Sequence, residues 1–139
     1  MPAKEKKRNT GCPVTFALDT FGDRWSLIII RDILLKGVKT YSELLKADEG
    51  IATNILANRL KEFEHSGIIT KARDPENKKQ YIYKITRKGA ELTPILLEMI
   101  RWSARHDPNT IAKKEVLKRI ENDREGLIKD IQQKALKRD

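Results

Sequence analysis

Apolar residues recur at helical spacing along the first part of the chain. A stripe from Val14 to Phe21 lies between Pro13 and Gly22, which predicts a helix that begins at the proline and ends at the glycine. Residues 25–35 are apolar on nearly every side, which is typical of a helix in the middle of a domain. An Ile-rich run is also compatible with a strand, but its length and the charged pair inside it favour the helix.

Residues 40–86 carry the pattern that says most about function. Thr40 begins a short helix, and Glu43 follows at the position that completes a capping box. After a turn at residues 48–50, a second helix is expected over about residues 52–66. One side of that helix is apolar, while the opposite side is polar and almost free of acidic residues. The polar side consists of Asn54, Ala57, Asn58 and Lys61.

The residues after this helix alternate with period two, which predicts a β-hairpin with its tip at residues 74–79. Ile69, Lys71 and Arg73 share one face of the first strand, and Tyr81, Tyr83 and Ile85 share one face of the second. A helix-turn-helix followed by a cationic hairpin is shaped to bind DNA, because the second helix fits a major groove and the hairpin reaches an adjacent backbone or minor groove. The sequence therefore predicts a mainly α winged helix-turn-helix fold with a small β-hairpin wing.

The second half of the chain is predicted to be helical. A helix begins at Thr86, and Pro94 inside it implies either a kink or a restart capped by Thr93. Residues 107–109 break the chain, and residues 111–137 predict one long, charged C-terminal helix. Its thin apolar stripe consists of Leu117, Ile120, Leu127 and Ile131. A helix this polar needs a surface to pack on, which is either a second chain or its own domain.

Three regions follow from this organisation. Residues 1–11 form a basic N-terminus that we expect to be disordered, residues 12–106 form the DNA-binding domain, and residues 107–139 form a helical extension used for dimerisation or packing. The chain has 139 residues, a net charge of +9 and a pI of about 9.7. A field of that sign attracts polyanions and is compatible with nucleic-acid binding, although charge alone does not establish it.

Composition excludes several classes of protein. The single cysteine, Cys12, rules out an intrachain disulfide framework and a multi-cysteine zinc site. His65 and His106 stand apart from any cluster of ligating residues, so no metal site is expected. No apolar run approaches the about 20 residues needed to span a bilayer, and the N-terminus does not resemble a signal peptide, so we expect a cytoplasmic protein. No catalytic motif or phosphate-binding loop is present, so neither an enzyme nor a cofactor is expected.

The order of these motifs resembles the HxlR-type winged-helix transcription regulators, relatives of the MarR-like group. The resemblance covers about residues 12–102 and rests on Cys12-Pro13-Val14, Gly22-Asp23-Arg24-Trp25, residues 27–34, Tyr41-Ser42-Glu43-Leu44, Gly50-Ile51, Leu56, Arg59-Leu60, Gly67-Ile68, Tyr83, Ile85-Thr86, Lys88-Gly89 and Trp102. It implies a homodimer, formed by the first and last helices, that binds an operator through two winged helices and represses or activates nearby genes. Residues 52–54 and 78–80 depart from the family's usual residues.

Ten residues are the predicted DNA contacts, in the two short helices and the wing. They are Lys39, Thr40, Thr53, Asn54, Asn58, Lys61, Lys71, Arg73, Lys78 and Lys79. Asparagine can pair with adenine through two hydrogen bonds, lysine donates to guanine or phosphate, and arginine suits narrow minor grooves. Other interpretations stay open: the helix residues only solvate an outer face, the wing cations only keep a hairpin soluble, and Thr40 only caps a helix. Arg59, at the border of the apolar face, is expected in a structural ion pair or stacking role as often as on a phosphate.

The resemblance also suggests a dimer interface and a candidate sensor. The interface consists of Val14, Leu18, Ile95, Met99 and Trp102, extended by Leu117, Ile120, Leu127 and Ile131. Some members of the resembling family sense oxidants or electrophiles through an N-terminal cysteine. Cys12 has the matching position, where a helix dipole and nearby cations favour the thiolate. The alternative is an inert cysteine buried in the interface.

The expected function is a sequence-specific transcription regulator, a repressor rather than an activator, that binds a pseudo-palindromic operator as a homodimer. Its partners would be double-stranded DNA and a second copy of the chain, with an effector small molecule or an oxidant as an additional ligand to test for. Two alternatives remain: a winged-helix protein-interaction module of a transcription or replication assembly, and a non-specific nucleic-acid binder. The polar, acid-poor helix face speaks against the first alternative, because interaction faces are usually more apolar.

Overall fold

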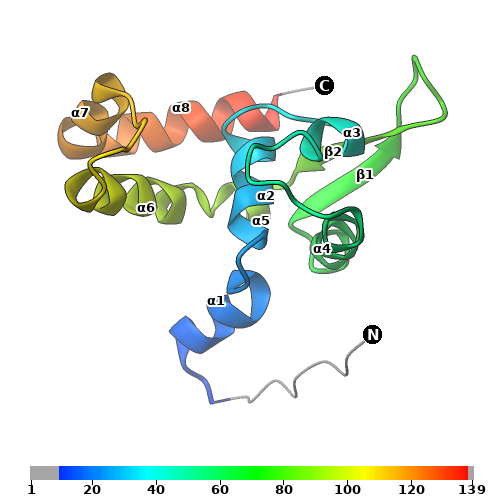
Figure 1. The fold of residues 1–139 in the computed structure, drawn as a ribbon, viewed down its shortest axis with the longest axis horizontal. Helices are drawn as coiled ribbons and strands as arrows, with labels where there is room; N and C mark the ends of the chain where they lie inside the picture. The colour runs from blue at the N-terminus through cyan, green and yellow to red at the C-terminus, as the bar shows by residue number, and fades with distance from the viewer. Residues whose placement is uncertain (1–9, 138–139) are drawn as a thin grey trace.

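The computed structural model describes residues 10–137, so most of the N-terminal segment expected to be disordered lies outside the described residues. Figure 1 shows a winged helix with α1 standing off at one end and the C-terminal helices against the opposite side. In chain order the elements are α1 (Pro13–Phe21), α2 (Ser26–Leu34), α3 (Tyr41–Leu44), α4 (Thr53–His65), β1 (Ile69–Arg73), β2 (Tyr81–Ile85), α5 (Arg87–Ala90), α6 (Thr93–His106), α7 (Lys114–Asn122) and α8 (Arg124–Leu136). The predicted fold class is confirmed.

The helix α2 forms the centre of the core, as its nearly uniform apolarity predicted. Ile29, Ile30, Ile33 and Leu34 are all buried, and α2 packs against α6, α8 and β2. The strand alternative for this segment is therefore wrong. Burying four large aliphatic side chains contributes several kcal/mol of hydrophobic stabilisation, which makes α2 a rigid base for the elements around it.

The helices α3 and α4 are joined by a tight turn, as the helix-turn-helix pattern predicted. The Thr40 hydroxyl caps α3 by accepting the backbone N–H of Glu43, and it donates to the Glu43 carboxylate over 2.8 Å. Gly50 in the turn and Gly67 after α4 have φ values of 74° and 80°, a region where side chains other than glycine's are strained. These local signals place both ends of α4.

One face of α4 packs on the core and the other is left outside. Leu56, Leu60 and Phe63 are buried, with 0%, 2% and 1% of their surface exposed. They lie at the spacing of a single helical stripe, so the predicted division into an apolar and a polar side is confirmed.

The hairpin has the predicted alternation, and its base is part of the core. Ile69 pairs with Ile85 and Lys71 with Tyr83, so the two predicted strand faces are the same face of the sheet. Ile69, Tyr83 and Ile85 are buried, whereas the strands leave the core toward the tip. The backbone N–H of Tyr83 also donates to the Lys39 carbonyl over 2.8 Å, which ties the wing to the start of α3.

Pro94 restarts a helix instead of kinking one. The short α5 begins after Thr86, whose hydroxyl accepts the Gly89 N–H, and α6 then begins at Thr93 with the proline in its first turn. Thr93 does not cap α6, because Leu92 has the N-cap position and the buried Thr93 hydroxyl donates to the Ala90 carbonyl.

The prediction of one long C-terminal helix is wrong. The helix is interrupted at Asp123, which has φ −148° and ψ 46°, and the two separate helices α7 and α8 pack against each other. Arg119 contacts Asp123 at 2.8 Å and Asp130 at 3.0 Å, so it fastens the two helices across the break. Gly126 lies against the Asp123 carboxylate, which would have to move to admit a Cβ atom at this position.

The apolar stripe of this extension packs on its own domain, which was the alternative to a dimer seam. Ile120 and Leu127 are buried in a cluster with Leu97 of α6, while Leu117 and Ile131 are partly buried at its edge. The predicted extension of the dimer interface through Leu117, Ile120, Leu127 and Ile131 therefore needs correction. A single helix could present all four to a second chain, but the bend at residue 123 buries Ile120 and Leu127 within the protomer and leaves Leu117 and Ile131 partly buried.

The helix α8 covers the back of the winged helix. Ala135 is buried in the main core, and α8 contacts α2, α5, α6 and β2. The Gln132 side-chain amide donates to the Ala90 carbonyl over 3.0 Å. The C-terminal extension thus supports α5 and the base of the wing from the side opposite α4 (Figure 1). No helix among residues 10–137 is long and apolar enough to cross a membrane.

Candidate nucleic-acid interface

The outer face of α4 is open to solvent. Asn54, Ala57 and Lys61 are exposed and Asn58 is partly buried, so the four residues of the predicted polar side remain reachable from outside. Thr53, at the first turn, is also exposed, and its backbone carbonyl accepts a hydrogen bond of 3.0 Å from the Tyr41 hydroxyl. The contact fixes the start of α4 against α3 without using the side chains on the outer face.

Arg59 forms a structural ion pair, one of the roles expected for it. Its Nη1 lies 3.3 Å from the Asp23 carboxylate in the turn between α1 and α2, and its Nη2 donates to the Asn58 Oδ1 over 2.7 Å. Asp23 also accepts the backbone N–H groups of Trp25 and Ser26, which caps the first turn of α2. A continuous set of contacts therefore joins the core helix to the outer face of α4.

The wing carries its cations over an aromatic ring. Lys71 Nζ lies 4.1 Å from the centre of the Tyr81 ring, and the Arg73 guanidinium carbon lies 4.8 Å from it. Arg73 also donates to the Lys78 carbonyl over 2.6 Å, which holds the guanidinium across the hairpin. Both cations are thus orientated by the strand pairing of Arg73 with Tyr81.

The wing tip is organised by Asp74. Its backbone N–H donates to the Gln80 carbonyl, and its carboxylate accepts from the Gln80 amide at 2.8 Å and the Glu76 backbone N–H at 2.9 Å. These hydrogen bonds, that of Gln80 first, lower the pKa of the Asp74 carboxyl. The tip is therefore a defined turn, and Lys78 and Lys79 project from it as exposed cations.

The residues at the start of α3 mainly make contacts within the protomer. Thr40 is buried with 9% of its surface exposed, and its hydroxyl is taken up by the cap on Glu43. The interpretation of Thr40 as a helix cap therefore accounts for its contacts. Lys39 is partly buried, and its carbonyl accepts from the wing.

A second surface, formed by α1 and α6, is apolar and open. None of the residues Pro13–Phe21 is buried, and Val14, Phe16 and Leu18 are 65%, 74% and 57% exposed. On α6, Met99 and Trp102 are 48% and 67% exposed.

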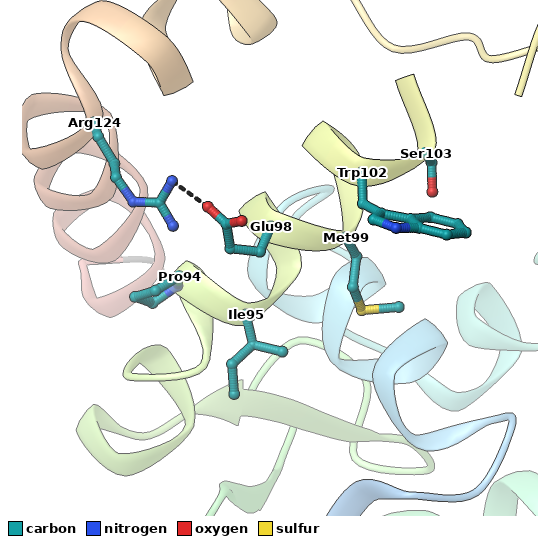
Figure 2. A pocket seen from close by; sticks show the side chains of 7 residues that line it. All are labelled: Pro94, Ile95, Glu98, Met99, Trp102, Ser103 and Arg124. Carbon is teal, nitrogen blue, oxygen red and sulfur yellow. Dashed lines mark ion pairs between the residues drawn. The ribbon is translucent and has the colours of Figure 1, made fainter. Parts of the chain in front are cut away.

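Beside them lies an open hollow of about 600 Å³ that Figure 2 shows from close by. Ile95 and Met99 project into view from α6, and the ion pair of Glu98 with Arg124 of α8 closes one side. An exposed apolar area of this kind is typical of a protein interface.

Cys12 lies at the N-cap of α1 and is exposed. Hydrogen bonds from the backbone and side chain of Thr15, and from the backbone of Val14, lower the pKa of its thiol. The thiol is therefore accessible within this protomer, and its thiolate form is favoured.

Three of the residues that shape these surfaces could not be identified from the sequence. Tyr81 was placed on the correct strand face. Its contact with Lys71 and Arg73 depends on the register of the two strands, which the sequence of the loop does not determine. Asp23 was noted only as part of a motif, since nothing in the sequence links it to residue 59. Phe16 falls outside the apolar stripe of α1, and it is exposed on a helix in which no residue is buried within the protomer.

Comparison with known proteins agrees with this geometry. Residues 20–110 match the HxlR-like helix-turn-helix family. The uncharacterised helix-turn-helix-type transcriptional regulator sll1512 of Synechocystis is 34% identical over 88 residues, which are 63% of this chain and 64% of that protein, just under two thirds. The transcriptional regulator YodB of Bacillus subtilis is 35% identical over 96 residues, which are 68% of this chain and 85% of YodB.

Solved structures resemble the chain over a similar range. PA1607 superposes with a TM-score of 0.68 at 31% identity, covering 76% of this chain and 73% of its own. Reduced YodB gives a TM-score of 0.57 at 31% identity, covering 71% and 97%, and the redox regulator HypR in its oxidised form gives 0.61 at 29%, covering 68% and 97%. The match over residues 20–110, together with the winged helix, shows that this chain belongs to the HxlR-like helix-turn-helix family of transcriptional regulators.

Proposed function

We propose that this protein is a homodimeric, sequence-specific DNA-binding repressor that acts on a pseudo-palindromic operator. The observation that carries the proposal is the open polar face of α4, with Asn54, Asn58 and Lys61, beside a cationic wing. The helix would lie in a major groove, and the wing would contact flanking phosphates or a minor groove. Repression requires only that the operator be occupied, so it is the direction of control we propose.

The open apolar surface supports the homodimer. Leu18 and Val14 on α1, and Ile95, Met99 and Trp102 on α6, are exposed in the protomer, where water contact costs free energy. A second copy would bury α1 and α6 in the interface, and the dimer would then present two α4 faces to DNA. Two recognition helices related by a twofold axis require half-sites about 10–10.5 base pairs apart, or a multiple of that spacing.

The wing cations support a strong electrostatic component. Lys71, Arg73, Lys78 and Lys79 are exposed, and each phosphate contact that they make releases condensed counterions. Affinity for the operator is therefore expected to fall steeply with salt, with a slope that decreases by about one for each contact removed.

We further propose that Cys12 makes the regulator sensitive to electrophiles. The thiol is exposed, and its pKa is lowered by hydrogen bonds from Thr15 and Val14. YodB has been solved in a quinone-bound form and HypR is described as a redox regulator. In this chain the Cys12 thiolate would add to a ring carbon of a quinone. One S–C bond forms, the π bond of the ring C=C breaks, its electron pair moves to the conjugated carbonyl oxygen, and solvent supplies the proton to that oxygen. Such an adduct at the start of α1 would change the dimer surface.

Selection of bound duplexes from a random-sequence pool tests the proposal. A palindromic motif is expected. Absence of binding would point to a protein-interaction module, and binding without a motif to a non-specific binder, and either result would overturn the proposal. Treatment of the protein with a quinone should weaken its binding to the selected duplex, and Cys12→Ser should abolish that effect. Equal sensitivity of wild type and variant would remove Cys12 from the mechanism.

A further inference from the structure

One end of the Asn58 side-chain amide is already hydrogen-bonded within the protein. Its Oδ1 accepts a hydrogen bond of 2.7 Å from Arg59 Nη2, while Nδ2 makes no hydrogen bond to another residue in the described part of the chain. A guanidinium has only donors, so the reverse orientation would place Nδ2 against another donor. The contact with Arg59 therefore fixes which end of the amide points outward.

Arg59 is itself held from behind. Asp23 lies 3.3 Å from its Nη1, and the same carboxylate accepts the N–H groups of Trp25 and Ser26, each over 3.1 Å. Ser26 is completely buried at the start of the core helix α2. The guanidinium is thus anchored at the start of the buried core helix, and it is only partly exposed, with 24% of its side-chain surface accessible.

We propose that Arg59 is a positioning residue that determines specificity, by making Asn58 present its amide nitrogen, and not its oxygen, to the DNA bases. This inference rests on the proposed DNA-binding function and specifies what α4 reads. An asparagine that pairs with adenine through two hydrogen bonds needs both its oxygen and its nitrogen. Because the Asn58 oxygen is turned toward Arg59, the end of the amide that points outward is Nδ2, which offers two donors.

The class of base edge follows from the donor pattern of the grooves. In the major groove guanine offers O6 and N7, adenine offers N7, and thymine offers O4, so each has an acceptor for Nδ2. Cytosine offers only its N4 donor there. At the base that Asn58 faces, cytosine is therefore the one that this geometry rejects.

The experiment uses the full-length protein and the motif that the wild type selects from random duplexes. Asn58→Ala identifies the motif position that Asn58 reads, where the preference should fall about 5- to 150-fold. Arg59→Met should relax the same position and no other. The double variant should lose no more base preference than Asn58→Ala alone, because both substitutions remove the same contact with the base. Asn58→Asp, which presents only acceptors, should shift the preference at that position toward cytosine.

Three results would overturn the proposal. Arg59→Met could lower affinity for all duplexes equally and reduce the salt slope by about one, which would mean a phosphate contact. It could leave base preference at that position unchanged, or Asn58→Ala could change no position. A wild type that selects no motif would instead overturn the proposed function itself.

Two conservative variants separate positioning from a merely structural role. Arg59→Lys keeps a donor for Asn58 but loses the planar fork, so it should restore part of the preference lost in Arg59→Met. Asp23→Asn keeps an acceptor for the cap of α2 while weakening the hold on Arg59, so it should relax the same position by a smaller factor. If Arg59→Met does not fold, these two variants carry the test, and unchanged preference in both would overturn the proposal.

Discussion

Arg31 on α2 holds the carboxylate of Glu49 through two hydrogen bonds of 2.9 and 3.0 Å, and so joins the core helix to the turn between α3 and α4. Arg31 also contacts Asp32 at 2.8 Å, which places its guanidinium between two carboxylates. The fork of hydrogen bonds is specific to arginine and fixes the distance of the turn from α2. The approach of the helix-turn-helix to the core is therefore set partly by this pair.

Glu49→Gln is predicted to reduce stability in a pH-dependent manner. The hydrogen bonds from Arg31 lower the pKa of Glu49 from 4.5 to about 2. A carboxyl whose pKa is depressed by folding stabilises the folded state above its ordinary pKa, and that contribution is lost as the pH falls from about 4.5 toward 2. The variant should lose about 0.5–1 kcal/mol of unfolding free energy at pH 7 and a smaller amount at pH 2.

Urea unfolding at several pH values measures this difference. Glu91→Gln, at the exposed position that ends α5, is the control and should change stability little at any pH. A Glu49→Gln variant with a wild-type profile between pH 2 and 7 would contradict the prediction.

Most of the fold could be predicted from the sequence because its signals are local. The Thr40–Glu43 capping box, the glycines at positions 50 and 67 and the period-two alternation after residue 69 each define an element within a few residues. The capping and turn chemistry depends on neighbouring atoms only, so it can be recognised without knowing the tertiary structure.

The parts that sequence analysis missed depend on contacts between distant residues. The bend at Asp123 is held by the ion pair of Arg119 with Asp130 across the break and by burial of Leu127 against Leu97, and neither contact has a local signature. The Asp23–Arg59 pair spans 36 residues. The α4 face itself was predicted by helical periodicity, but the orientation of the Asn58 amide could not be, because it requires knowing what lies beside it.

Leu127→Ala is predicted to destabilise the protomer. Leu127 is 7% exposed and packs with Leu97 and Ile120, so removing its side chain leaves a cavity that costs about 2–5 kcal/mol. Leu136→Ala, at a position 40% exposed on the same helix, is the matched control and should cost less than about 1 kcal/mol. Denaturant unfolding compares the two. If Leu127→Ala left the stability unchanged but abolished the dimer, Leu127 would belong to the interface between two chains.

Met99→Glu is predicted to prevent dimerisation. Met99 is 48% exposed on the open face of α6, and a carboxylate there would have to be buried against a second copy without a partner. Light scattering after gel filtration should show a monomer, whereas Leu136→Glu, which alters a residue of similar exposure on α8, should stay dimeric. A dimeric Met99→Glu variant would show that α6 does not form the interface.

Tyr81→Leu is predicted to weaken binding to every DNA sequence alike. Lys71 and Arg73 lie 4.1 and 4.8 Å from the centre of the Tyr81 ring, which orients both cations on the wing. A cation–π contact at an exposed site contributes about 0.5–1 kcal/mol, so loss of the ring should reduce affinity about two- to fivefold per contact used. Tyr81→Phe keeps the ring and should retain wild-type affinity. Fluorescence anisotropy with the selected operator and with a scrambled duplex measures both. A loss confined to the operator would mean that Tyr81 reads sequence, since a contact made through phosphates weakens both duplexes by the same factor.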